Sequence, residues 1–153
     1  MNQATRVVIE TADSGARRLL ADVLRAATRL MARRTFRAGL PIDLHRRRVQ
    51  QATRLTFAPR GTTFMSAVCG GIPGEWVRAR GRSKTPLVIL YLHGGGYVSG
   101  SPSSHRAVTG HLAARCDARV FAADYRLAPE HPFPAALDDA LAAYRGLLEE
   151  GVD

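Results

Sequence analysis

The sequence predicts an α/β protein with a parallel sheet. Two strongly apolar runs, residues 86–92 and 119–123, are each followed by a segment in which apolar residues recur at helical spacing. An order of strand, helix, strand and helix is typical of a parallel sheet. The two runs are apolar almost throughout rather than alternating, which indicates strands buried on both faces. With 153 residues and 46% hydrophobic content, the chain is long enough for a domain with its own core.

Residues 1–60 differ in composition from the rest of the chain and are predicted to be helical. Apolar residues recur at helical spacing over residues 14–38, and Gly39 ends the pattern. A second helix is predicted over residues 42–55. The sequence places four basic residues on the outside of this second helix: His45, Arg46, Arg47 and Arg48. Residues 1–60 hold 13 Arg and 4 acidic residues, so they carry the whole net charge of +9.

The basic first helix leaves two interpretations open. Its arginine-rich face could lie on an anionic membrane or on a nucleic acid. Alternatively the arginines are solvated while the apolar stripe packs on the domain, and this is the interpretation that we favour. Peripheral membrane contact therefore stays an alternative, and nucleic acid is not the expected partner.

The rest of the chain is predicted to form strands first and then alternating helices and strands. Residues 62–68 and 75–79 are expected to pair as a hairpin joined by residues 70–74. One helix is predicted over residues 103–114, and another begins at Pro134, a residue type that fits the first helical position. This last helix has four apolar residues on one face: Leu137, Leu141, Tyr144 and Leu148.

Composition also limits the location and the cofactors of the protein. Cys69 and Cys116 are too few for a disulfide framework or a metal site, so we expect each to be a small buried hydrophobe. The sequence has no apolar run of ~20 residues and no secretory layout at its N-terminus, so a cytoplasmic location is expected. No cofactor and no metal are expected, because the histidines lack zinc-ligand spacing. The four histidines considered for this are His93, His105, His111 and His131.

The motif that carries chemistry is His93-Gly94-Gly95-Gly96, which directly follows the apolar run 86–92. Glycines let the chain turn sharply and let a substrate approach the backbone. Bare backbone N–H groups at such a position can stabilise the negative charge that develops on a carbonyl oxygen during acyl transfer. The motif therefore predicts an oxyanion hole.

The nucleophile that such a hole normally serves is not found, because the sequence holds no Gly-x-Ser-x-Gly. Ser99 lies in the glycine loop with the spacing Gly-x-x-Ser-Gly, so it is not expected to replace that serine. His111 and Cys116 are five residues apart on a predicted helix and do not share a face. The glycines also fail the dinucleotide-binding pattern, whose third glycine would be Ser99.

Two stretches in this order carry a family resemblance: His93-Gly94-Gly95-Gly96-Tyr97, and residues 124–136, which read Asp-Tyr-Arg-Leu-Ala-Pro-Glu-His-Pro-Phe-Pro-Ala-Ala. Together they resemble the α/β-hydrolase fold of the hormone-sensitive-lipase-like esterases. The resemblance covers about the last 90 residues. It implies that residues 61–153 are the N-terminal half of the hydrolase domain, ending before the nucleophile strand. It also implies that residues 1–60 are the helical cap segment.

The resemblance implies roles for individual residues. The amides of Gly94 and Gly95 would be oxyanion donors, and His93 and Gly96 would shape their loop. Tyr97 would contact the substrate. Three further residues would form a structural brace in which Arg126 and Glu130 pair locally: Asp124, Arg126 and Glu130.

The function expected from the resemblance is hydrolysis of short or medium acyl esters through a serine acyl-enzyme. The serine, histidine and acid of the triad would all lie in the missing half, so the chain alone is expected to be inactive. The strand that ends at His93 would then be an open sheet edge, and a second polypeptide or self-association would cover it. The alternatives are a non-catalytic remnant or a binding module that uses the basic helix.

Overall fold

The computed structural model describes residues 15–35, 39–53, 56–81 and 87–151, and the chain divides into two compact units, residues 1–38 and 39–153. In the first unit, α1 (Gly15–Thr35) forms the predicted amphipathic helix. Its Asp22 accepts a hydrogen bond of 3.0 Å from Arg25. The ends of the two predicted N-terminal helices, at residues 14, 36–38 and 54–55, lie outside the described residues. None of the described helices is long and apolar enough to cross a membrane.

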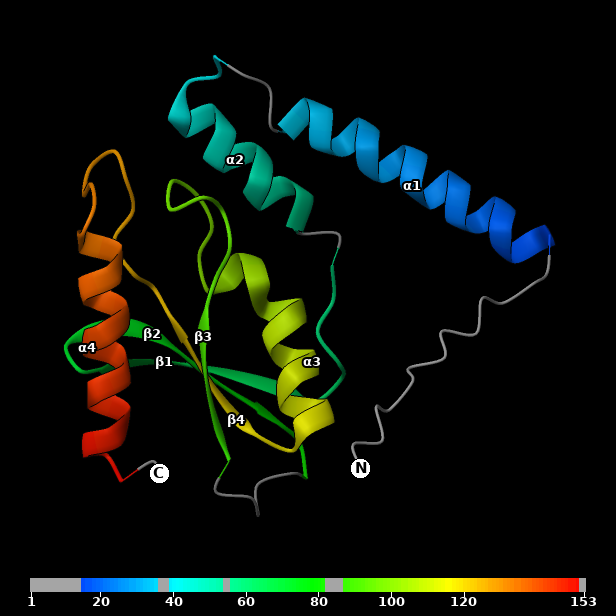
Figure 1. Cartoon of the computed structure of the whole chain (residues 1–153). Helices are drawn as coiled ribbons and strands as arrows, with labels where there is room; N and C mark the ends of the chain where they lie inside the picture. The colour runs from blue at the N-terminus through cyan, green and yellow to red at the C-terminus, as the bar shows by residue number, and fades with distance from the viewer. Residues whose placement is uncertain (1–14, 36–38, 54–55, 82–86, 152–153) are drawn as a thin grey trace, which may run out of the picture. The chain divides into compact units, whose positions relative to one another are not determined.

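The second unit contains a four-stranded sheet and its covering helices (Figure 1). Its elements are α2 (Ile42–Thr53), β1 (Thr62–Cys69), β2 (Ile72–Ala79), β3 (Val88–Leu92), the short 3-10 turn η1 (Ser103–His105), α3 (Arg106–Cys116), β4 (Arg119–Ala123) and α4 (Ala135–Glu149). The strands lie in the order β1-β2-β4-β3. The chain therefore has the predicted α/β class, with a mixed sheet.

The predicted hairpin is present, but its strands are longer than expected. β1 and β2 pair antiparallel from Thr62 opposite Ala79 to Cys69 opposite Ile72. Only Gly70 and Gly71 separate them, and both have positive φ. A two-residue turn with this conformation matches the twist of the flanking strands. The predicted linker 70–74 was therefore too long, because Ile72 to Gly74 already belong to β2.

The predicted parallel pair is confirmed. β3 lies parallel to β4, with Val88 opposite Arg119 and Leu92 opposite Ala123. β4 also pairs antiparallel with β2, which joins the hairpin to the parallel part of the sheet. In the described sheet β3 is consequently an edge strand.

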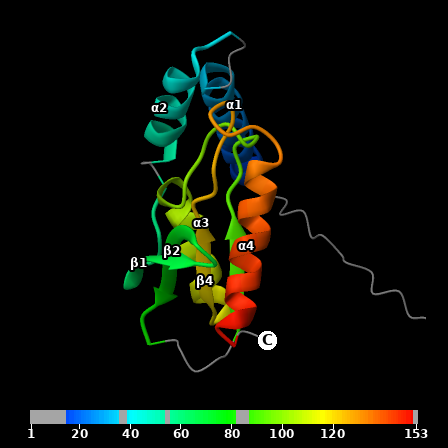
Figure 2. The ribbon, with the colours of Figure 1, turned by 90° about the vertical axis from the view of Figure 1, so that its left-hand side faces the viewer.

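Helices α3 and α4 cover opposite faces of the sheet (Figures 1 and 2). Val120 packs with Ala113 of α3, whereas its neighbour Phe121 packs with Leu147 of α4. Successive side chains of a strand point to opposite faces, so one strand contributes to both cores. β4 is buried on both sides, as its uninterrupted apolar sequence predicts.

The compact units and the two cysteines can be compared with the sequence predictions. The chain divides into compact units after residue 38, which places α2 in the same unit as the sheet, and the assignment of residues 1–60 as a cap segment stays a prediction. Cys69 is buried as expected, but Cys116 is exposed at the end of α3, so the prediction for Cys116 was wrong. Burial raises the pKa of the Cys69 thiol to about 11.

The four apolar residues predicted to share a face of α4 lie outside its buried face. The helix buries Asp139, Ala143, Gly146 and Leu147 instead. The exposed fractions of Leu137, Leu141, Tyr144 and Leu148 range from 42% to 52%. A second apolar stripe on α4 is therefore left open in the same unit as the edge strand β3.

Candidate active site

The glycine loop follows β3 and folds back on itself within eight residues. Its turn is closed by the amides of Val98 and Ser99, which both donate to the carbonyl oxygen of Gly95 at 3.2 and 3.1 Å. Gly95 has a φ of +134°, and an added Cβ would lie 2.0 Å from the carbonyl oxygen of Ser99. Only glycine fits this position, because a side chain would break the turn. Tyr97 also has a positive φ of 62°, which is a strained conformation for a residue with a side chain.

The backbone amides of Gly94 and Gly95 are available to a ligand. Within the described part of the chain, neither amide donates a hydrogen bond to a backbone or side-chain acceptor. Both residues line the same cavity. Anion stabilisation requires N–H donors that are not already used within the protein, and this adjacent pair beside the cavity meets that condition.

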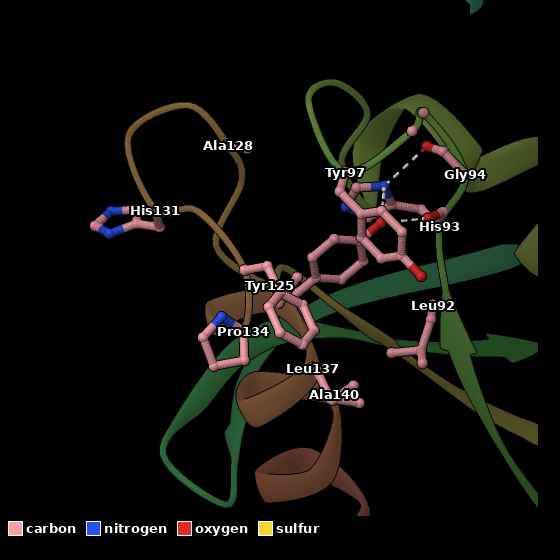
Figure 3. Close-up of a pocket in the computed structure, with 14 residues that line it drawn as sticks. Leu92, His93, Gly94, Tyr97, Tyr125, Ala128, His131, Pro134, Leu137 and Ala140 are labelled. Atoms are coloured by element: carbon pink, nitrogen blue, oxygen red, sulfur yellow. Dashed lines mark hydrogen bonds between the residues drawn. The ribbon is translucent and has the colours of Figure 1, made fainter.

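The cavity has a volume of about 710 Å³ and lies where β3, β4 and α4 meet (Figure 3). This size is within the range of small-molecule sites. Most of its lining is apolar or aromatic, which suits an acyl chain better than a charged ligand. The lining residues are Leu92, His93, Gly94, Gly95, Gly96, Tyr97, Tyr125, Ala128, His131, Phe133, Pro134, Ala136, Leu137 and Ala140.

His93 is held at the start of the loop by stacking and hydrogen bonds (Figure 3). Its ring stacks on Tyr125 with the ring centroids 4.2 Å apart. The Tyr125 hydroxyl donates to the His93 carbonyl oxygen, and the His93 Nδ1 lies 3.1 Å from the Gly94 carbonyl oxygen. Burial lowers the pKa of His93, so its imidazole is neutral at neutral pH. His93 is therefore a buried ring that is fixed in place at the start of the loop.

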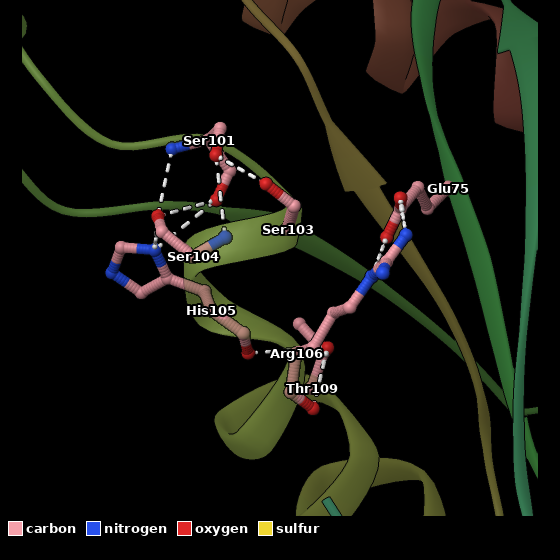
Figure 4. Close-up of polar contacts among 7 residues, drawn as sticks. All are labelled: Glu75, Ser101, Ser103, Ser104, His105, Arg106 and Thr109. Carbon is pink, nitrogen blue, oxygen red and sulfur yellow. Dashed lines mark hydrogen bonds and ion pairs between the residues drawn. The ribbon is translucent and has the colours of Figure 1, made fainter. Parts of the chain in front are cut away.

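The far end of the loop is fixed by a cluster of hydroxyl groups (Figure 4). The Ser104 hydroxyl accepts a hydrogen bond of 2.9 Å from the Ser101 amide and donates to the Ser101 carbonyl oxygen. His105 follows, and its ring lies 5.6 Å from that of His93. The next residue, Arg106, forms an ion pair with Glu75 of β2 and so ties α3 to the sheet. Both ends of the loop are thus anchored to the sheet.

The brace predicted from the sequence uses different partners. Arg126 and Glu130 do not pair with each other. Arg126 instead forms a bidentate ion pair with the buried Asp139 of α4, at distances of 2.7 to 3.0 Å. The Arg126 amide also donates to Asp139 at 2.8 Å. This network holds the exit of β4 against the first turns of α4 and lowers the pKa of Asp139.

Glu130 pairs with Arg46 of α2, which the sequence analysis had placed on the outside of its helix. The Arg46 guanidinium reaches both Glu130 carboxylate oxygens at 2.7 Å. The hydrogen bonds from Arg46 lower the pKa of the Glu130 carboxyl group to about 2. The remaining donors of Arg46 reach two loop carbonyl oxygens, those of Val98 and Ala128. The solvent-facing assignment of Arg46 was therefore wrong, whereas Arg47 beside it is exposed.

The third brace residue, Asp124, is held in position by a backbone hydrogen bond. The Asp124 amide donates to the Pro73 carbonyl oxygen at 2.8 Å, which joins the end of β4 to β2. Burial raises the pKa of its carboxyl group. Asp124 therefore lies at the strand exit that the sequence predicted.

The other residues considered as catalysts either have a structural role or lie exposed on α3. Ser99 is fully buried, and its hydroxyl donates to the Gly95 carbonyl oxygen at 3.1 Å. His111 and Cys116 are both exposed on α3. Among the described residues, no group of three or more His, Cys, Asp and Glu side chains could hold a metal ion.

Sequence reasoning missed three residues that build the site: Arg46, Tyr125 and Asp139. Each acts across a long separation in the chain, from 13 residues for the Arg126–Asp139 pair to 84 for the Arg46–Glu130 pair. Among these three, Asp139 has a local signal in the sequence, because acidic residues are favoured in the first turns of a helix.

The glycine loop lies at the exit of a parallel strand, beside a largely apolar cavity, and helices cover both faces of the sheet. This arrangement is that of the α/β-hydrolase fold. The sequence profile of the α/β-hydrolase fold family matches residues 89–153. This range includes the glycine loop, α3, β4 and α4. The chain therefore has the α/β-hydrolase fold, and it is similar to the hormone-sensitive-lipase-like esterases and hydrolases that follow.

Among curated proteins, an acetyl-hydrolase of Streptomyces hygroscopicus is 47% identical over 105 residues, which cover 68% of this chain and 33% of the relative. The carboxylic ester hydrolase LipN of Mycobacterium tuberculosis is 45% identical over 84 residues, covering 55% of this chain and 22% of the relative.

The chain is also similar to solved structures of esterases and lipases. An esterase from the bacterial hormone-sensitive lipase family superposes with a TM-score of 0.76 at 35% identity, covering 94% of this chain and 46% of that structure. A hormone-sensitive lipase from a metagenome library gives a TM-score of 0.73 at 39% identity, covering 82% of this chain and 42% of that structure. The chain thus spans less than half the length of these relatives.

Proposed function

We propose that this chain supplies the oxyanion hole and part of the acyl pocket of a carboxylic-ester hydrolase that acts on short or medium acyl esters. The observation that carries the proposal is the pair of unused amides at Gly94 and Gly95 on the wall of an apolar cavity. The names of the relatives, esterase and acetyl-hydrolase, support the same reaction class.

The chemistry would be serine acyl transfer. A serine hydroxyl attacks the ester carbonyl, and the amides of Gly94 and Gly95 stabilise the resulting oxyanion. Tyr97 and Leu137 would contact the acyl or alcohol group, since both line the cavity. His93 and Gly96 would keep the loop in shape. The serine, its histidine base and the acid would come from sequence outside these 153 residues, which lack the Gly-x-Ser-x-Gly motif.

We further propose that the open face beside β3 is covered in the active protein. β3 has only β4 as a neighbour among the described strands, and an apolar stripe of α4 is half exposed. A further strand from a second polypeptide, or a second copy of this chain, would bury both surfaces. The N-terminal residues 1–60 would serve as the cap segment.

A hybrid enzyme tests the proposed function. The chain is joined to the part of the Streptomyces hygroscopicus acetyl-hydrolase that follows its matched 105 residues. We expect the hybrid to hydrolyse a chromogenic acetyl or butyryl ester, while the 153-residue chain alone shows no turnover. A folded hybrid without activity would contradict the proposal.

A matched pair of variants in the hybrid tests the oxyanion hole itself. Gly94→Pro removes the N–H donor, whereas Gly94→Ala keeps it, and a Cβ at position 94 meets no atom within 4 Å. Loss of one oxyanion donor costs about 10²–10³ in kcat. We therefore expect a loss of that size for Gly94→Pro relative to Gly94→Ala. Equal kcat values for two folded variants would remove Gly94 from the oxyanion hole.

A further inference from the structure

We propose that Arg46 of α2 is a positioning residue for the glycine loop, and this inference rests on the proposed oxyanion hole. The Arg46 guanidinium joins two loops that are remote in the sequence. Its Nε donates to the Val98 carbonyl oxygen at 2.8 Å, and its Nη2 donates to the Ala128 carbonyl oxygen at 3.0 Å. Its outer edge pairs with both carboxylate oxygens of Glu130 at 2.7 Å.

The position of these acceptors separates the contact from an ordinary surface ion pair. Exposed ion pairs contribute little to stability. The Arg46 side chain, however, is only 27% exposed, and two of its acceptors are backbone carbonyl oxygens in the loops themselves. Hydrogen bonds from a charged donor are about twice as strong as neutral ones. Arg46 therefore fixes backbone, and Glu130 fixes the orientation of the guanidinium.

The hydrogen bond from Arg46 also affects Tyr97, the strained residue of the glycine loop. Tyr97 has a φ of 62°, and its carbonyl oxygen accepts a hydrogen bond of 2.8 Å from the Ala128 amide. The neighbouring peptide, at Val98, is held by Arg46. Strained backbone persists where its surroundings over-determine it. Arg46 and Ala128 together supply that constraint at Val98 and Tyr97, two to three residues after the Gly95 amide.

Arginine is required at position 46 by the geometry of its donors. Three separate nitrogen atoms of one planar group reach acceptors on two loops. A lysine ammonium is a single point and cannot span the same acceptors. Lysine should therefore restore the ion pair with Glu130 but not the link between the loops.

Hydrogen exchange of the 153-residue chain tests the proposal without any need for catalysis. The probes are the amides of Val98, Ser99 and Ala128, and the amides of β4 report global opening. We expect Arg46→Gln to speed exchange at the three loop amides roughly tenfold or more, the effect of losing one strong charged hydrogen bond. Arg46→Lys should restore only part of the protection. Arg47→Ala, which alters the exposed neighbour, should change nothing.

Two outcomes would overturn the proposal. One is unchanged exchange at the loop amides in Arg46→Gln, and the other is a rise of equal size in β4, which would show a general loss of stability. If Arg46→Gln does not fold, Glu130→Gln provides the same test, because it frees the guanidinium while leaving its two carbonyl acceptors. Glu130→Gln should raise exchange at the same amides by a smaller factor. Unchanged exchange in this variant would contradict the proposal.

The hybrid enzyme separates this proposal from the proposed function. An inactive wild-type hybrid would contradict the function while leaving the exchange result standing. In an active hybrid, Arg46→Gln should lower kcat about tenfold with a smaller change in KM, and Arg47→Ala should match the wild type. An unchanged kcat would show that the link between the loops does not position the amides.

Discussion

At the scale of single residues, the site depends on which charged side chains form ion pairs. Arg126 and Glu130 are four residues apart, and that spacing favours a local pair on a helix. The segment is not helical, however, and each residue pairs with a more distant partner, Asp139 and Arg46 respectively. The family resemblance pointed to these two charged residues as a brace, but it did not give their partners, because the contacts depend on how the loops and helices pack.

The Glu130–Arg46 pair predicts a dependence of stability on pH. The pKa of Glu130 is lowered from 4.5 to about 2 in the folded chain. The unfolded chain therefore takes up this proton first as the pH falls. The pair stabilises the fold fully above pH 4.5, and its contribution is lost as the pH falls towards about 2.

Urea unfolding at a series of pH values measures this effect. Glu130→Gln should be less stable than the wild type above pH 4.5, and the difference should vanish near pH 2. The exposed Glu149→Gln serves as the control and should run parallel to the wild type. A constant difference between Glu130→Gln and the wild type across this range would contradict the prediction.

At the scale of elements, the sequence predicted the order and type of the helices and strands well. The uninterrupted apolar runs of β3 and β4 and the helical periodicity of α4 are local signals, and burial on the sheet reinforces them. Local signals did not indicate which face of α4 is buried. Ala143 and Gly146 lie on the buried face together with Leu147, because small residues allow close approach, whereas Leu137, Leu141 and Leu148 lie to the side.

The ion pair between Arg126 and Asp139 predicts that α4 is fixed at its beginning. Asp139→Asn removes the charge from a side chain that is 6% exposed and accepts four hydrogen bonds. Because Arg126 is half exposed and screened by water, we expect a loss of only about 2 kcal/mol in unfolding free energy. The exposed neighbour Asp138→Asn should change it by less than about 0.5 kcal/mol. Equal losses in urea unfolding would contradict this role.

At the scale of the whole molecule, the described chain leaves one face incomplete. The edge strand β3 and the apolar stripe of α4 belong to the same unit, and apolar surface of this kind favours association. The sequence predicted the open edge through the family resemblance. It did not predict the exposed stripe, because periodicity alone does not say how many elements will cover a helix.

This open face predicts that the 153-residue chain associates with itself. Light scattering after size exclusion should show dimers or larger species that dissociate on dilution. Leu141→Lys together with Leu148→Lys should shift the chain towards the monomer, because charge on an apolar contact opposes burial. Val108→Lys alters an equally exposed apolar residue on α3 and should leave the distribution unchanged. A wild-type monomer at all concentrations would contradict the prediction.

The link made by Arg46 also has a consequence for biosynthesis. Its partner Glu130 lies 84 residues further along the chain. At translation rates of about 5–20 residues per second, several seconds pass before the ribosome has added that partner. A nascent chain can therefore form its hairpin before the glycine loop acquires its final shape.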